Sequence, residues 1–348
     1  MSETKPPSGA VPTNHRPAFL ITIDAEGDNV WSRQKNLTTA NSNFVPRFQA
    51  LCESYQLRPT YLTNFEMATC HRFQEFGRDI LKRGTGEIGM HLHPWNSPPL
   101  IPLTSDDARS HPYLTEYPEA VMRDKVAFLT DLLEETFGVK MTAHRAGRWG
   151  FNSTYARLLI ERDYLADCSV TPHVSWAKSV GDPAQKGGAD YSKFLELPYF
   201  IDPENIDRPG NSSLLEIPVT VMDVRPRLVR SIARLFPPKS LPRRALNHFF
   251  PPICRLYSPL PPVKLLLRAM ERAAAAERPC VQLALHSSEL MPGGSPFFPE
   301  AEDIDVLYDY LHLLFGAASK MFRGVTVTEF WREFWERKPA HGINQLTT

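Results

Sequence analysis

The stretch Ala18-Phe-Leu-Ile-Thr-Ile-Asp24-Ala-Glu26-Gly-Asp28 decides how the rest of the sequence is interpreted. It begins as a short, mostly apolar run, which is typical of a buried β-strand. The run ends in Asp24, and Glu26 and Asp28 follow at intervals of two residues. Residues at i and i+2 of an extended chain point to the same side, so Asp24 and Glu26 can face one site. The alternative is an Asx turn that closes the strand with its carboxylates in water.

Similar apolar runs alternate with amphipathic helical patterns along the chain, which is typical of βα units and a parallel sheet. We expect strands at residues 18–24, 59–63, 87–93, 141–145, 164–170, 214–221, 280–286 and 324–328. We expect helices at 44–55, 73–82, 117–137, 153–162, 261–276 and 301–318, and a last helix from residue 329. About eight strands in one series predict an α/β fold with a parallel (β/α) barrel, or a variant with one strand fewer.

Four chemically useful residues share one position in this pattern. Asp24, His93, Arg145 and His286 all lie at the C-terminal ends of expected strands. In β/α barrels, the loops at that end of the strands build the active site. The pattern therefore predicts a functional site formed by four separate segments.

His91 and His93 form an i, i+2 pair at the end of one of these strands, directly before Pro94. Both imidazoles can converge on one ion, and imidazole suits zinc and similar transition metals. Three protein ligands with one open coordination position would make a catalytic site. A purely structural role for the buried histidines is the alternative.

Arg145 and His286 suggest further roles. An arginine at a strand end can orient a carboxylate by paired hydrogen bonds, although an exposed ion pair is the alternative. His286 is well placed for a general acid. The loop after it contains Gly293 and Gly294 but no GxxxxGK[ST] motif, and the chain has no GxSxG elbow. A P-loop and a serine nucleophile are therefore disfavoured, and we interpret the glycine-rich loop as a flexible rim.

In combination these segments resemble the polysaccharide deacetylase family, carbohydrate esterase family 4. The family motif TFDDG resembles Thr22-Ile-Asp24-Ala-Glu26-Gly27, and HxxxH after an EIG-like strand resembles Glu87-Ile-Gly-Met-His91-Leu-His93. The arginine motif resembles His144-Arg145-Ala-Gly-Arg148-Trp149-Gly150, and LxLH resembles Leu283-Ala-Leu285-His286. A DxxW-type wall matches Asp167…Trp176 loosely. The resemblance covers roughly residues 19 to 329, interrupted by one insertion.

The resemblance implies a distorted, usually seven-stranded β/α barrel that removes acetyl groups from sugars with a divalent metal. It implies that Asp24 is the base, that Arg145 orients Asp24 and that His286 is the acid. The implied metal ligands, with zinc as the expected metal, are Glu26, His91 and His93. The expected substrate-binding side chains are Trp95, Trp149 and Trp176. The loop at 286–297 resembles the branch associated with bacterial surface-polysaccharide synthesis, such as lipopolysaccharide or capsule.

Two motifs depart from the family pattern. The adjacent carboxylates become Asp24-x-Glu26, and HxxxH becomes His91-x-His93 with Trp95 in the fifth position. Each change keeps two usable side chains on one face of a strand. Asp24 or Asp28 could exchange roles with Glu26 as the carboxylate ligand.

The insertion lies at residues 224–272 and is basic and rich in proline. Residues 224–270 contain ten Lys and Arg, no Asp or Glu, and nine of the 32 prolines. Because the whole chain is neutral, the remainder carries a charge of about −10. Leucine and phenylalanine are interleaved with the cations, which predicts peripheral contact with an anionic membrane. The alternative is a helical arm that packs on the barrel or on another copy of the chain.

Composition excludes several other classes. Lys and Arg (39) balance Asp and Glu (39), so binding to nucleic acid is disfavoured. The five cysteines form no CxxC pair, which disfavours a disulfide scaffold and fits a reducing compartment.

We expect a tail at 1–17, a barrel at 18–338 and a C-terminal tail at 339–348. We also expect a cytoplasmic protein, peripheral at the inner face of the membrane if the insertion binds lipid.

The leading functional hypothesis is a metal-dependent deacetylase that hydrolyses N-acetyl groups on a sugar or polysaccharide intermediate, which could be lipid-linked. One alternative is an amidohydrolase-type enzyme acting on a small amide. That class usually needs further histidine and aspartate ligands on later strands, and His144 and His286 are the obvious extra histidines. The other alternative is an inactive carbohydrate-binding relative. The oligomeric state stays open.

Overall fold

A computed structural model describes residues 16–337 except for 33–36, 180, 182–186 and 238–239. The expected C-terminal tail lies outside the described residues, as does the expected N-terminal tail apart from residues 16 and 17.

The centre of the molecule is a curled sheet in which seven parallel strands follow one another in the order β11, β1, β2, β3, β4, β5, β8. Their bounds are β11 (Cys280–His286), β1 (Ala18–Ala25), β2 (Thr60–Thr63), β3 (Glu87–Leu92), β4 (Ala143–Ala146), β5 (Ala166–Asp167) and β8 (Leu215–Glu216). An antiparallel hairpin, β6 (Tyr199–Asp202) and β7 (Asn205–Pro209), extends the β8 edge. The expected α/β fold with a distorted, barrel-like sheet is confirmed.

The two edges of the parallel sheet approach each other through Thr220, four residues beyond β8. The Thr220 amide donates to the Gln282 carbonyl on β11 over 3.4 Å, and the Gln282 amide donates to the Thr220 hydroxyl over 2.9 Å. The sheet therefore curls into a half-barrel whose two edges are bridged by these hydrogen bonds.

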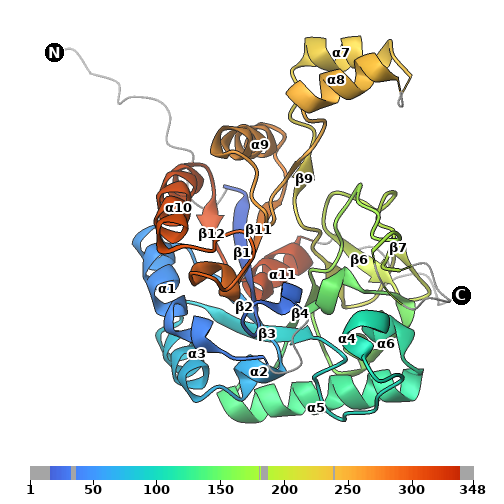
Figure 1. The fold of residues 1–348 in the computed structure, drawn as a ribbon, viewed down its shortest axis with the longest axis vertical. Coiled ribbons are helices and arrows are strands. Elements are labelled where there is room, and N and C mark those ends of the chain that lie inside the picture. Colours follow the sequence, from blue (N-terminus) through green and yellow to red (C-terminus); the bar gives the residue numbers. More distant parts are fainter. Residues whose placement is uncertain (1–15, 33–36, 180, 182–186, 238–239, 338–348) are drawn as a thin grey trace, which may run out of the picture.

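Helices pack around this sheet (Figure 1). Their bounds are α1 (Val45–Ser54), α2 (Phe65–Ala68), α3 (His71–Arg83), α4 (Asp107–Ser110), α5 (Glu119–Phe137), α6 (Ser153–Glu161), α9 (Val263–Ala275), α10 (Ala301–Met321) and α11 (Val327–Glu336). The longest helix of the first half, α5, buries Val126, Leu129 and Leu133 at helical spacing and ends at Gly138, whose φ is 68°. All eight residues of β1 are buried, as expected of a strand covered on both faces.

The register of the strands aligns the residues that matter for chemistry. Asp24 pairs with His286 across β1 and β11, and His91 pairs with Arg145 across β3 and β4. Because these strands are parallel, their C-terminal ends meet at one edge of the sheet. The site therefore follows directly from the register.

Three points of the expected secondary structure need correction. The strand expected at 324–328 is wrong: β12 covers only Arg323–Gly324, and α11 starts at Val327. Thr326 caps α11, because its hydroxyl accepts from the Glu329 amide and the Glu329 carboxylate accepts from the Thr326 amide. The single strand expected at 214–221 is divided into β8 and β9 (Val221–Met222), and the β6–β7 hairpin was not expected.

Two helices of the expected insertion, α7 (Arg227–Arg234) and α8 (Leu241–Phe249), stand away from the barrel at the top of Figure 1. They are joined to the body through β9 and β10 (Cys254–Arg255), which pair antiparallel. The helix α9, whose N-terminal part also falls in the expected insertion, covers the barrel and buries Leu266, Ala269, Met270 and Ala273. In the described part of the chain, every helix is too short or too polar to span a membrane.

Candidate active site

A cavity of about 440 Å³ opens at the C-terminal ends of β1, β3, β4 and β11. Of the residues expected to be functional, all but Arg145 line it. They are Asp24, Glu26, His91, His93, Trp95, Trp149, Trp176 and His286. Arg145 lies fully buried behind Asp24. The structure thus brings the predicted site residues together, from segments up to 262 positions apart in the sequence.

Glu26, His91 and His93 place three potential ligand atoms close together and away from solvent. Nε2 of His93 lies 3.0 Å from Oε2 of Glu26 and 3.1 Å from Nε2 of His91. Nε2 of His91 lies 3.4 Å from the same Glu26 oxygen. Among the described residues, these are the one set of three or more side chains whose spacing could hold a metal ion.

The hydrogen bonds around His91 fix its tautomer. Its Nδ1 lies 2.9 Å from the carbonyl oxygen of Arg145, which can only accept, so Nδ1 carries the proton. Burial lowers the pKa of His91, but the carboxylates of Asp24 and Glu26 outweigh burial and raise it. A metal ion would therefore displace the proton from Nε2, which points toward Glu26 and His93. Ligands at about 2.1 Å in a tetrahedral zinc site are about 3.4 Å apart. Both the donor set and its spacing therefore fit a divalent transition metal.

The protonation states of Glu26 and His93 follow from their burial and from the charged groups around them. Burial raises the pKa of Glu26, but hydrogen bonds from His91 and His93 outweigh burial and place the pKa well below its usual value. Burial is the main cause that lowers the pKa of His93 to about 4, so this ring is neutral at pH 7. An ionised carboxylate and a neutral imidazole are the forms that bind metal.

Gly147, in the loop after β4, allows this loop to approach the cluster. A Cβ atom at this position would lie 2.4 Å from the Leu92 carbonyl oxygen and 2.8 Å from Nδ1 of His93. Any side chain would therefore displace β3 or the His93 ring. This close approach explains why residue 147 is a glycine.

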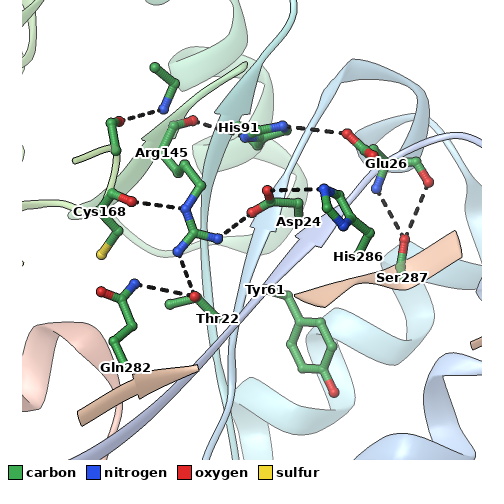
Figure 2. A network of polar contacts seen from close by, with 12 residues as sticks. Thr22, Asp24, Glu26, Tyr61, His91, Arg145, Cys168, Gln282, His286 and Ser287 are labelled. Atoms are coloured by element: carbon green, nitrogen blue, oxygen red, sulfur yellow. Dashed lines mark hydrogen bonds and ion pairs between the residues drawn. The ribbon is translucent and has the colours of Figure 1, made fainter. Parts of the chain in front are cut away.

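Asp24 is held between two cationic side chains (Figure 2). Nη1 of Arg145 donates to Oδ1 of Asp24 over 2.6 Å. The other guanidinium nitrogens donate to the Cys168 carbonyl at 2.9 Å and to the Thr22 hydroxyl at 2.6 Å. Arg145 thus binds Asp24 through one nitrogen, not through a bidentate pair of hydrogen bonds. Oδ2 of Asp24 faces the cavity, 3.8 Å from Nε2 of His286.

His286 is set up to be protonated at neutral pH. Burial lowers its pKa, but the carboxylates of Glu289, Glu26 and Asp24 outweigh burial and raise the pKa to about 9. Glu289 contributes most of this effect, and its Oε1 lies 3.3 Å from Nδ1 of His286. Glu289 is buried and was not expected to contribute, although its position three residues after His286 was visible in the sequence.

Asp28 has a different role from its two neighbours. Its carboxylate accepts hydrogen bonds from the Thr38 hydroxyl, the amides of Ala40 and Asn41, and the Asn41 side chain. The Asn41 side chain also donates to the carbonyl of Glu26. Asp28 therefore organises the loop behind Glu26, and Glu26 is the carboxylate that faces the histidines.

Aromatic rings form part of the cavity wall, next to the polar cluster. Trp149 and Trp176 stack at 6.4 Å between ring centroids with planes inclined by 13°, and Trp95 lies 4.4 Å from the His93 ring. Tyr257, which follows β10 within the insertion, lies 5.7 Å from Trp149 and also lines the cavity. The cavity is also lined by several residues that the sequence did not single out for it, namely Tyr113, Arg255, Tyr257 and Phe297.

His144 and Asp167 lie outside the cavity. Nδ1 of His144 lies 2.5 Å from Oδ1 of Asp167, and its Nε2 lies 2.8 Å from the Tyr155 hydroxyl. All three side chains are fully buried. His144 is therefore occupied within the core and does not add a ligand to the cluster.

No protein-family model matches the sequence, and no curated protein matches it. A proposed polysaccharide deacetylase from Mycobacterium smegmatis has a TM-score of 0.54 at 16% identity, over 99% of both chains. A proposed glycoside hydrolase/deacetylase from Parabacteroides distasonis has a TM-score of 0.60 at 9% identity, over 94% of this chain and 73% of that one. A 4-alpha-glucanotransferase from Thermococcus litoralis has a TM-score of 0.51 at 13% identity, over 92% and 41%. At these identities the likeness shows the fold alone, and this fold is shared with polysaccharide deacetylases.

Proposed function

We propose that this protein is a metal-dependent deacetylase that hydrolyses the N-acetyl group of a sugar or glycan. One observation carries the proposal. The buried Glu26–His91–His93 cluster, Asp24 and His286 all line one cavity, which several aromatic side chains also line. This arrangement combines a candidate metal site, a candidate base, a candidate acid and a surface for a sugar ring.

The residues divide the hydrolysis between them. A divalent ion held by Glu26, His91 and His93, with zinc as the expected ion, would polarise the acetyl carbonyl and acidify a water molecule. Asp24, fixed by Arg145, accepts the proton of the attacking water. Protonated His286 donates its proton to the leaving nitrogen as the C–N bond breaks. The products are acetate and the free sugar amine.

The aromatic wall supports a carbohydrate substrate. The stacked pair Trp149 and Trp176 and the neighbouring Tyr257 present apolar ring surface beside the polar cluster. Amphipathic rings of this kind supply contact area for an apolar sugar face and keep polar groups for orientation. An N-acetylated sugar or glycan, such as an intermediate of surface-polysaccharide synthesis, is therefore the substrate class that we propose.

The amidohydrolase alternative is less well supported. It needs further histidine ligands, and His144 is bound to Asp167 and Tyr155 in the core. His286 interacts with Glu289 and Asp24, on the side of Asp24 opposite Arg145. Within the described ranges, the candidate site therefore holds one three-ligand cluster.

Acetate release tests this function. The purified chain is stripped with a chelator, reloaded with Zn²⁺ and incubated with N-acetylglucosamine oligomers. We expect acetate and free amine in equal amounts from the reloaded protein and neither from the stripped protein. Loaded protein that releases no acetate from any N-acetylated or O-acetylated sugar would favour the inactive carbohydrate-binding relative. Cleavage of small cyclic amides instead would favour the amidohydrolase.

A further inference from the structure

The projecting helices α7 and α8, together called the hairpin below, have features that the proposed reaction does not use. We propose that this hairpin docks the protein on an anionic lipid bilayer, with its apolar side chains at the interface and its arginines against the lipid headgroups. This binding does not depend on the proposed reaction and can be measured without it.

The hairpin is poorly packed against the rest of the molecule. It stands away from the barrel in Figure 1. In α8 no residue is buried, and Ala233 is the buried residue at the end of α7. A helical arm that packs on its own barrel would bury one of its faces. In the described part of the hairpin, the helices instead leave Leu228, Leu235 and Phe249 exposed to solvent.

Each helix exposes one row of apolar side chains. In α7 and its C-cap the row is Leu228, Ile232 and Leu235, at i, i+4 and i+7. In α8 it is Leu241, Ala245 and Phe249, at i, i+4 and i+8. Residues at these spacings lie on one face of a helix. Leu228, Leu235 and Phe249 are 71%, 78% and 75% exposed. A group of large apolar side chains this exposed is unusual unless the surface binds a partner.

The same hairpin carries cations without acids. Residues 224–270 contain no Asp or Glu. The acid before them, Asp223, lies 3.3 Å from Arg230 and 3.6 Å from Arg225 and so offsets those two arginines at the root. Within the described residues, Arg234, Arg243 and Arg244 make no ion pair. The outer part of the hairpin is therefore basic as well as apolar.

These two properties together favour an anionic bilayer over other occupants. Lipid headgroups attract the arginines, while the interface takes up exposed leucine and phenylalanine. A nucleic acid would match the charge but leave the apolar rows in water. A second copy of the hairpin would cover the apolar rows but bring like charges together.

The root of the hairpin also forms part of the catalytic cavity. After α8 the chain returns through β10, and Arg255, Tyr257, Ser258 and Pro259 then line the cavity. A docked hairpin therefore holds the cavity near the bilayer. For the proposed deacetylase, this position suits an acetylated sugar that is carried on a lipid.

Vesicle co-sedimentation tests the docking. The full chain is mixed with vesicles of phosphatidylcholine alone and of phosphatidylcholine with phosphatidylglycerol, at low and high NaCl. We expect binding to the anionic vesicles that weakens at least several-fold as the NaCl concentration rises, because salt screens the attraction between the arginines and the anionic headgroups. We expect little binding to the neutral vesicles.

Two triple variants separate the two contributions. Leu228→Ser/Leu235→Ser/Phe249→Ser removes apolar contacts, and Arg234→Gln/Arg243→Gln/Arg244→Gln removes charge. Each should reduce binding to anionic vesicles at least tenfold while the thermal unfolding curve stays that of the wild type, because the altered side chains are not buried. The matched control is Val306→Ser/Leu313→Ser on α10, at positions 68% and 61% exposed, and it should bind like the wild type.

Three results would overturn the proposal. They are equal and salt-independent partition to both vesicles, no partition to either, or undiminished binding by both triple variants. A dimer in sedimentation velocity that the apolar triple variant dissociates, without vesicle binding by the wild type, would assign the surface to a second copy. Because the readout is binding, loss of docking and loss of acetate release can be told apart.

Discussion

Arg145 donates from Nη1 to Oδ1 of Asp24 over 2.6 Å. Its backbone carbonyl, on the same residue, accepts from Nδ1 of His91 over 2.9 Å. One residue at the end of β4 therefore positions both the proposed base and one proposed metal ligand. This double role explains why an arginine is fully buried next to the cavity.

Asp24→Asn should separate catalysis from metal binding. Asparagine keeps an oxygen that can accept from Arg145, but it cannot take a proton from water. We expect kcat to fall by about 10²–10⁴-fold, the range for loss of a general base. Bound metal, measured by elemental analysis, should stay near the wild-type level, since Glu26, His91 and His93 are unchanged. An empty site in this variant would instead make Asp24 a principal ligand.

The pH profile should report His286. Its pKa of about 9 keeps the ring protonated through neutral pH, so kcat/KM should hold until about pH 9 and then fall as the acid loses its proton. Glu289 is the main cause that raises this pKa. Glu289→Gln should therefore move the basic limb to lower pH.

The control for this shift is Glu302→Gln, which removes an exposed carboxylate from α10. Its basic limb should coincide with that of the wild type. A basic limb that stays in place in Glu289→Gln would show that His286 is not the group that titrates.

Asp28→Asn should affect folding more than chemistry. The change places an NH₂ group, a donor, against a loop that already supplies four donors to this carboxylate. We expect the free energy of unfolding to fall by about 1–3 kcal/mol in denaturant titration. Metal content of the folded protein should be retained. Loss of metal with unchanged stability would mean that Asp28 binds the ion.

Trp176→Ala should weaken substrate binding. It removes one ring of the stacked pair in the cavity wall. Aromatic contacts of this kind contribute about 0.5–1.5 kcal/mol, so KM should rise about 2- to 12-fold with a smaller change in kcat. Trp335→Ala removes a ring that stacks on Trp331 away from the cavity and serves as the control. Equal KM values for both variants would remove the aromatic wall from substrate recognition.

Much of the site could be predicted because it depends on local patterns. Asp24, His93 and His286 are each marked by an expected apolar strand that ends in a polar residue, and parallel register then aligns the strand ends. Glu26 and His91 could be predicted from these residues, since alternate residues share a face.

The parts of the fold and site that could not be predicted depend on contacts between segments that are distant in the sequence. Residues 324–328 look like a strand because 325–328 are all β-branched, but acceptors on other elements favour the start of a helix. The Val327 amide donates to the Thr60 hydroxyl at 3.1 Å, and the Thr328 amide donates to Glu87 at 3.2 Å. Tyr257 likewise reaches the cavity through the return of the insertion, which has no local signal.

The metal content of the purified protein tests the central claim most directly. Elemental analysis of the wild type should give about one divalent ion per chain, with zinc preferred when several metals are offered. His91→Ala/His93→Ala should reduce this to background, while His71→Ala/His312→Ala, which removes two histidines away from the cavity, should keep the ion. Full occupancy in the His91→Ala/His93→Ala protein would contradict the account.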